Sequence, residues 1–116
     1  MEIDNSNKVT NLDYLTELSK GNAQFIADMI EIFIIESPKE IALLEKSIID
    51  KNFISIKSSA HKMRSTIPFL GLDKIIEKEV LEIEILAASQ SDIKKIEILF
   101  SKIKNVYQKA VQELKV

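Results

Sequence analysis

The sequence predicts an all-α protein, and three observations support this class. The chain of 116 residues contains only 2 glycines and 2 prolines, so long stretches can continue without a helix breaker. Its composition is 46% hydrophobic and 29% charged, which suits one core with a solvated surface. Apolar residues recur at intervals of three and four along most of the chain, which is the spacing of one helix face. We therefore expect a single helical domain.

The N-terminal region predicts a short helix after an irregular start. Residues 1–10 show no periodicity and are expected to form a flexible lead-in to a domain that covers 11–116. The stretch "NLDYLTELSKGN" then indicates a short helix that Gly21 ends, since glycine readily adopts the conformation of a helix C-terminus. Asn22 is placed to cap the next helix.

Two further helices are expected on either side of the stretch "SPKE". The first runs from about Ala23 to Glu36, with apolar residues on more than one side. Ser37 can accept hydrogen bonds from the free amides of a helix start, and proline suits the first helical position. We therefore expect a separate helix from Pro38 to about Asp50.

The segment from about residue 52 to 70 has the clearest helical pattern. Its core-facing residues are separated by 3, 4, 3, 4 and 3 positions: Phe53, Ile56, Ala60, Met63, Ile67 and Leu70. The opposite side carries Ile54, Lys57, Ser58, His61, Arg64, Ser65 and Pro68. The only histidine of the chain is thus predicted to face outward. Pro68 is expected to distort the last turn of this helix.

The C-terminal part predicts two more helices. Gly71 ends the preceding helix, and Asp73 can cap one that runs to about residue 88. Ser91 or Asp92 then opens a last helix that extends toward the C-terminus. Short connections favour antiparallel neighbours, so we expect an antiparallel up-down-up-down four-helix bundle with two additional N-terminal helices, one of them short.

Composition excludes several classes of function. Eighteen acidic and sixteen basic residues give a net charge of -2, so no basic field is available for nucleic acid. No apolar run approaches the ~20 residues of a membrane span, and the absence of cysteine removes disulfides and thiolate chemistry. We expect a cytoplasmic protein that binds neither membrane nor nucleic acid, and that holds no metal or cofactor.

The surroundings of His61 favour an anionic ligand. Small or cationic side chains share its side of the helix or adjoin it: Lys57, Ser58, Lys62, Arg64 and Ser65. No carboxylate lies within one turn along the chain, so neither a metal site nor a histidine oriented by a neighbouring acid is indicated. A phosphoryl group attached to the imidazole would suit this face, whereas an incidental exposed histidine is the simpler alternative.

The stretch "AHKMRSTIPFLG" resembles the signature of histidine-containing phosphotransfer (HPt) domains, the intermediates of multistep phosphorelays. Matching positions are Ala60, His61, Met63, Thr66 and the closing pair Leu70 and Gly71. The early helices and their Gly-Asn junction are also similar, so that the resemblance covers about residues 11 to 114. Two positions depart from the family's pattern, because Arg64 replaces the usual lysine and Ser65 the usual glycine.

The resemblance implies that His61 accepts a phosphoryl group from a receiver aspartyl phosphate, through Nε2, and passes it to another receiver aspartate. Arg64 would then stabilise the phosphoryl group, Lys62 would give electrostatic support, and Ser65 would affect access. Such a chain is a phosphocarrier rather than a self-contained enzyme, and its catalytic Mg²⁺ would belong to the receiver.

The resemblance implies that the partners are receiver domains of response regulators, a hybrid sensor kinase, or both. The chain itself is expected to be a monomer. The residues expected to form the docking surface are Phe25, Met29, Ile32, Ile54, Lys57, Ser58 and Pro68. The alternative is a non-catalytic helical interaction module, such as a degenerate HPt domain, in which His61 is incidental.

Overall fold

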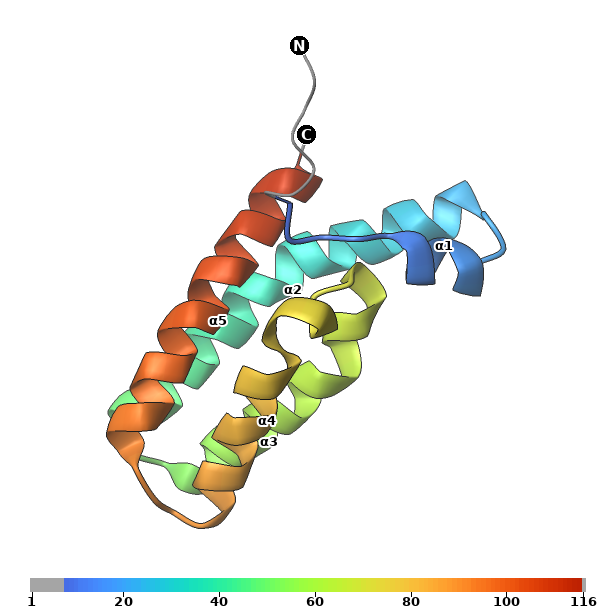
Figure 1. The fold of residues 1–116 in the computed structure, drawn as a ribbon. Coiled ribbons are helices and arrows are strands. Elements are labelled where there is room, and N and C mark those ends of the chain that lie inside the picture. The colour runs from blue at the N-terminus through green and yellow to red at the C-terminus, as the bar shows by residue number, and fades with distance from the viewer. Residues whose placement is uncertain (1–7, 116) are drawn as a thin grey trace.

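The computed structural model describes residues 8–115, and these form helices and short connections without any strand (Figure 1). This confirms the predicted all-α class. The elements are α1 (Asp13–Leu18), α2 (Ala23–Ile49), α3 (Phe53–Thr66), the 3₁₀ helix η2 (Ile67–Leu70), α4 (Asp73–Ala88) and α5 (Ile93–Leu114). Within the described range, no helix combines the length and the apolar character that a membrane crossing requires.

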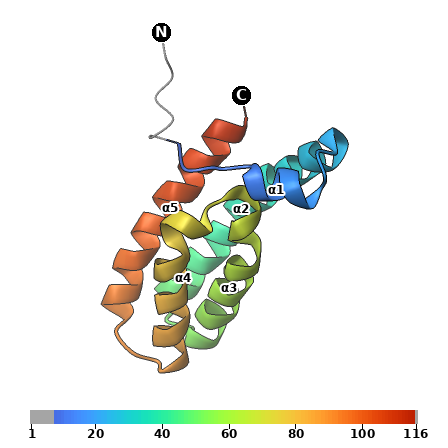
Figure 2. The same ribbon diagram turned by 45° about the vertical axis from the view of Figure 1, so that its right-hand side comes forward.

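The long helices pack around one hydrophobic core. α3 and α5 each contact both α2 and α4, while η2 contacts α1, α3 and α4 (Figures 1 and 2). Fully buried side chains from every long helix meet in this core: Leu44, Ile56, Met63, Ile76, Ile83, Ile96 and Ile103. Burial of each such side chain contributes about 1.5–3 kcal/mol. The predicted core-facing row of the segment 52–70 is confirmed, since all its members except the part-buried Phe53 are buried.

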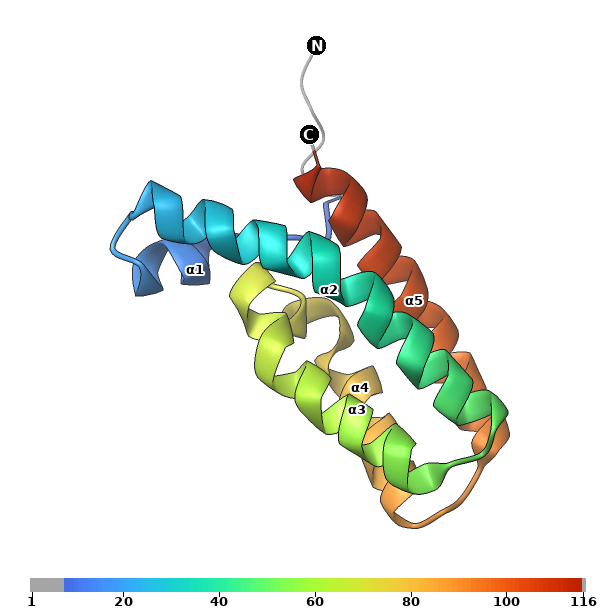
Figure 3. The same ribbon diagram turned by 180° about the vertical axis from the view of Figure 1, so that it is seen from behind.

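α2 is one continuous helix, and its N-terminal half extends with α1 beyond the other long helices (Figures 1 and 3). The prediction of two helices separated at Pro38 is therefore wrong, and only α1 precedes the four long helices. Proline has no N–H, so Pro38 leaves the Ile34 carbonyl without its helical donor. Pro38 is exposed, and this carbonyl therefore lies away from the core. On the core side, Ser37 and Ile41 are buried, and this packing holds the helix together through the proline.

The segment predicted as one helix ending at residue 70 divides into α3 and η2. Pro68 lies in the first turn of the 3₁₀ helix, where its missing N–H costs little. Gly71 then ends η2 with a φ of 74°, in the left-handed region that favours glycine. The predicted cap of α4 is wrong, because Leu72 occupies the N-cap position without a side-chain bond and Asp73 is already helical.

Two other predicted caps are confirmed. The Asn22 side chain accepts a hydrogen bond from the Phe25 amide at 3.0 Å, at the start of α2. Asp92 accepts one from the Lys95 amide at 3.1 Å, at the start of α5. Each cap satisfies one of the free amides of a helix N-terminus.

The described part of the predicted lead-in contacts the C-terminal end of α5, and Asn11, which follows it, contacts η2. The Glu113 carboxylate accepts hydrogen bonds from the Val9 amide at 2.8 Å and from the Thr10 amide at 3.0 Å. The Asn11 amide donates to the Leu70 carbonyl at 2.8 Å. These bonds bring Asn11 over Gly71. Residues 1–7 of the predicted lead-in lie outside the described residues.

We expect Gly71→Ala to destabilise the fold by about 2–4 kcal/mol, because strain at positive φ adds to a steric clash. A Cβ at Gly71 would lie 2.6 Å from the Asn11 Cβ and 2.8 Å from its carbonyl oxygen. Gly21 has a similar φ of 76° with nothing within 4 Å of an added Cβ, so Gly21→Ala is the matched control. It should cost only about 1–2 kcal/mol. Urea unfolding measures both, and equal losses would show that Asn11 does not pack tightly on Gly71.

Candidate functional site

His61 lies near the middle of α3 with its side chain 73% exposed. The preceding Ala60 and the following Met63 are buried in the core, and this fixes the rotation of the helix. The imidazole consequently projects from the surface, as the helical spacing predicts.

A carboxylate from α4 contacts this histidine. Nδ1 of His61 lies 2.9 Å from Oε2 of Glu84, and Nη1 of Arg64 donates to Oε1 of the same carboxylate at 2.9 Å. The Glu84 side chain is 14% exposed, so the contact is shielded on the α4 side. One carboxylate thus holds the side chains of both His61 and Arg64.

The charge state of Glu84 follows from these contacts. Burial alone would raise the pKa of its carboxyl, but the hydrogen bonds from Arg64 and His61 outweigh burial and lower the pKa below the usual value. Glu84 is therefore ionised at neutral pH, and an ionised carboxylate only accepts hydrogen bonds. We infer that Nδ1 of His61 carries the proton, which leaves the Nε2 lone pair of the neutral ring free.

Sequence reasoning did not find Glu84. The residue lies 23 positions after His61 and on a different helix, so the search within one turn could not reach it. The only feature of the sequence that pointed to Glu84 was its position next to Ile83. Ile83 is buried, so Glu84 lies at the edge of the core-facing side of α4. Only the packing of α4 on α3 shows that this edge adjoins His61.

Arg64 is more restrained than a solvent-facing cation would be. Its side chain is 37% exposed, its Nη1 is bound to Glu84, and its Nε is buried without a hydrogen-bond partner among residues 8–115. The guanidinium is therefore held beside the imidazole. Since Nε is buried and Nη1 is bound to Glu84, Nη2 is the amino group that remains to donate to an anion on that side.

Lys62 lies on another side of α3 from His61. Its Nζ is 3.9 Å from Oε1 of Glu40 on α2, and its side chain is 71% exposed. Lys57 and Ser58 are exposed, and Lys57 lies one turn before His61. The Ser65 hydroxyl donates to the Lys62 carbonyl at 2.7 Å, so it folds back onto its own helix. This leaves the approach to the imidazole open.

The predicted docking residues divide into two groups. Phe25, Met29 and Ile32 lie on the projecting half of α2, where Phe25 and Ile32 are 41% and 54% exposed while Met29 packs against the core. Pro68 is part-buried in η2. Ile54 is 80% exposed in the first turn of α3, and its seven-residue separation from His61 corresponds to ~10 Å of helix. Phe25, Met29, Ile32 and Pro68 therefore lie toward one end of α3 and Ile54 toward the other, with His61 between them.

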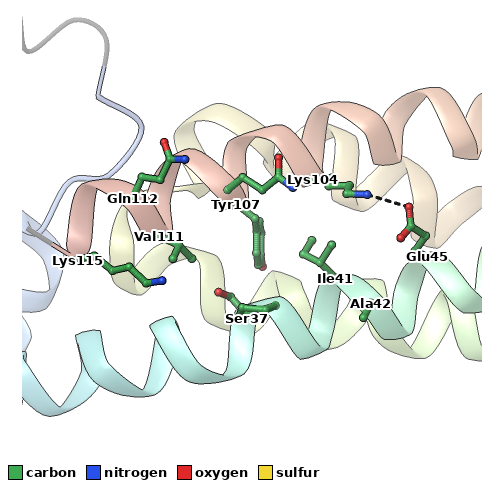
Figure 4. A pocket seen from close by; sticks show the side chains of 11 residues that line it. Ser37, Ile41, Ala42, Glu45, Lys104, Tyr107, Val111, Gln112 and Lys115 are labelled. Carbon is green, nitrogen blue, oxygen red and sulfur yellow. Dashed lines mark hydrogen bonds and ion pairs between the residues drawn. The ribbon is translucent and has the colours of Figure 1, made fainter.

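Two hollows adjoin α2. The larger, of about 650 Å³, lies between α2 and α5, and Figure 4 shows Tyr107 pointing from α5 toward α2, where Ser37 lies. Its charged Lys104 and Glu45 already pair with each other at 3.0 Å. The smaller, of about 120 Å³, lies between the projecting half of α2 and the α3–η2 junction.

No protein-family model matches the chain, and neither a curated protein nor a solved structure matches it significantly. Within residues 8–115, no group of three or more histidines, aspartates and glutamates gathers as a metal site would require.

We expect Glu84→Ala to change the tautomer of His61. In the wild type the carboxylate favours the Nδ1–H form, whereas without it the neutral ring can populate the Nε2–H form as well. Ring ¹⁵N chemical shifts measured above pH 8 distinguish the two forms. Glu82→Ala on the same helix is the matched control, because Glu82 pairs with Lys95 instead, at 2.6 Å. Identical ring shifts in wild type and Glu84→Ala would contradict the inferred tautomer.

Proposed function

We propose that this protein is a phosphocarrier, and specifically an HPt domain that relays phosphoryl groups between receiver domains through His61. The observation that carries the proposal is an exposed imidazole whose Nδ1 is bound by a carboxylate while an arginine is held alongside. The four long helices would form the antiparallel up-down-up-down bundle of that family, and their pairwise contacts support this arrangement. The proposal includes receiver domains as partners and the cytoplasm as location.

The proposed transfer step uses the free lone pair of His61. Nε2 attacks the phosphorus of a receiver aspartyl phosphate and forms the P–N bond. The P–O bond breaks, and the aspartate carboxylate leaves with its electron pair. The ring becomes cationic, and Glu84 stabilises this charge through the Nδ1 proton, which remains on the ring. Reversal of the step onto another receiver aspartate completes the relay.

Arg64 would stabilise the transferred group. A phosphoryl group carries its charge on the equatorial oxygens, so catalysis depends mainly on position and electrostatics. Because Glu84 binds Arg64 through one amino group, the guanidinium is positioned before the phosphoryl group arrives, and its other amino group can bind an oxygen. Lys57 can add positive charge from the preceding turn, whereas Lys62 is directed toward Glu40.

We expect a receiver domain charged with radiolabelled acetyl phosphate to transfer label to the wild-type chain. The label should be acid-labile and alkali-stable, as a phosphorus–nitrogen bond is. His61→Gln should take up no label, because the chain contains no other histidine. Label that persists on His61→Gln would exclude His61 as the acceptor and favour the non-catalytic interaction module.

We expect Arg64→Ala to slow this transfer by about tenfold or more, since one preorganised donor to a developing anion contributes roughly 10²–10³-fold in other enzymes. Arg64→Lys should recover part of the rate, because it restores a cation without the planar donor pair. Single-turnover transfer from the charged receiver measures both variants, and circular dichroism verifies that each is folded. Wild-type kinetics in Arg64→Ala would reduce this residue to a structural partner of Glu84.

A further inference from the structure

The smaller hollow, which we call the α2–η2 pocket, combines an apolar wall with two acids. Met29, Ile32 and Phe69 contribute the apolar wall, and Glu36 and Glu40 lie one helical turn apart on α2. Its volume of about 120 Å³ is several times the ~30 Å³ share of one water molecule. The pocket can therefore hold the end of a side chain rather than a single water.

No cation is among the residues that line the pocket, and each of the two acids has only a weak cationic partner outside it. The Glu40 side chain is 19% exposed, and the nearest cation, Nζ of Lys62, is 3.9 Å away, beyond hydrogen-bond distance. Glu36 contacts Lys39 at 3.3 Å, but both side chains are more than half exposed, so this pair contributes little. Burial raises the pKa of Glu40; Lys62 opposes the rise and the neighbouring Glu36 adds to it. A cation in the pocket would relieve this unfavourable arrangement.

A buried hydroxyl group provides a second, independent observation. Ser37 lines both this pocket and the larger hollow, is 1% exposed, and its Oγ has no hydrogen-bond partner among the described residues. The Tyr107 hydroxyl is likewise buried and has no partner among the described residues, but Tyr107 lines the larger hollow between α2 and α5 and not this pocket. A buried hydroxyl group without a partner can accept a hydrogen bond from a donor that enters the pocket.

We propose that the α2–η2 pocket binds a lysine side chain of a docking partner protein. The alkyl stem would lie along Met29, Ile32 and Phe69, and the ammonium group would meet the Glu40 and Glu36 carboxylates and the Ser37 hydroxyl. Three ammonium protons match these three acceptors, and the apolar wall fits the four methylene groups. The planar guanidinium of arginine is a larger head group with a fixed donor fork, which suits the compact pocket less well.

The proposal does not depend on phosphorylation, because His61 is not among the residues that line this pocket. It adds a specific anchor to the projecting half of α2, on which predicted docking residues lie. The complementary feature on the partner would be an exposed lysine within its docking surface.

The full chain should bind N-acetyl-lysine methylamide at millimolar concentration, detected as saturable amide shifts at Ser37, Glu40 and Thr66 in ¹H–¹⁵N spectra. The norleucine counterpart, which keeps the alkyl chain and lacks the ammonium group, should bind at least about tenfold more weakly. Equal binding of the two probes, or no saturable shift with the lysine probe, would overturn the proposal.

Glu40→Gln should weaken the lysine probe about tenfold or more, since it removes one charge-assisted acceptor. Glu31→Gln, an exposed position on α2 outside the pocket, is the matched control and should bind as the wild type does. Glu40→Gln should fold, because a raised carboxyl pKa means that ionisation at neutral pH opposes folding and the amide removes that cost. Unchanged binding in Glu40→Gln would overturn the proposal.

His61→Gln should retain full binding, so failure of this site and failure of the relay are separate results.

Discussion

The candidate site depends on one interaction, the binding of both His61 and Arg64 by the Glu84 carboxylate. Its two oxygens bind the imidazole of His61 and the guanidinium of Arg64, each at 2.9 Å. Without it, Arg64 would be a half-buried cation without a counter-ion, and His61 would be free to exchange tautomers. With it, the exposed imidazole and the guanidinium are held side by side at a defined place on the surface.

This arrangement depends in turn on how α3 and α4 pack. Ala60 and Met63 on one helix and Val80 and Ile83 on the other are buried, which fixes the rotation of both helices about their axes. Glu84 follows Ile83 directly and therefore lies at the edge of the interface, where it reaches across to α3. The small Ala60 side chain before His61 is part of the same core. The site is thus a consequence of core packing rather than of a loop.

The two prolines show how tertiary contacts modify local signals. At Pro38 the signal for a helix start was strong, yet Ser37 and Ile41 are buried on one continuous face, and packing of that face holds α2 together. At Pro68 the chain does change, because η2 replaces the last turn of α3 and leads to Gly71. The continuous α2 carries its N-terminal half beyond the other helices, and the α2–η2 pocket forms where that half passes the α3–η2 junction.

The sequence by itself determined the all-α class, the approximate extent of the last three long helices and the outward direction of His61, because these follow from helical periodicity and from local caps such as Asn22 and Asp92. It could not determine that α2 continues through Pro38, since local propensity and core packing oppose each other there. Nor could it place Glu84 beside His61 or Lys62 beside Glu40, because these pairs join different helices. Contacts across helices depend on the rotation and neighbours of each helix, and the packed core alone decides both.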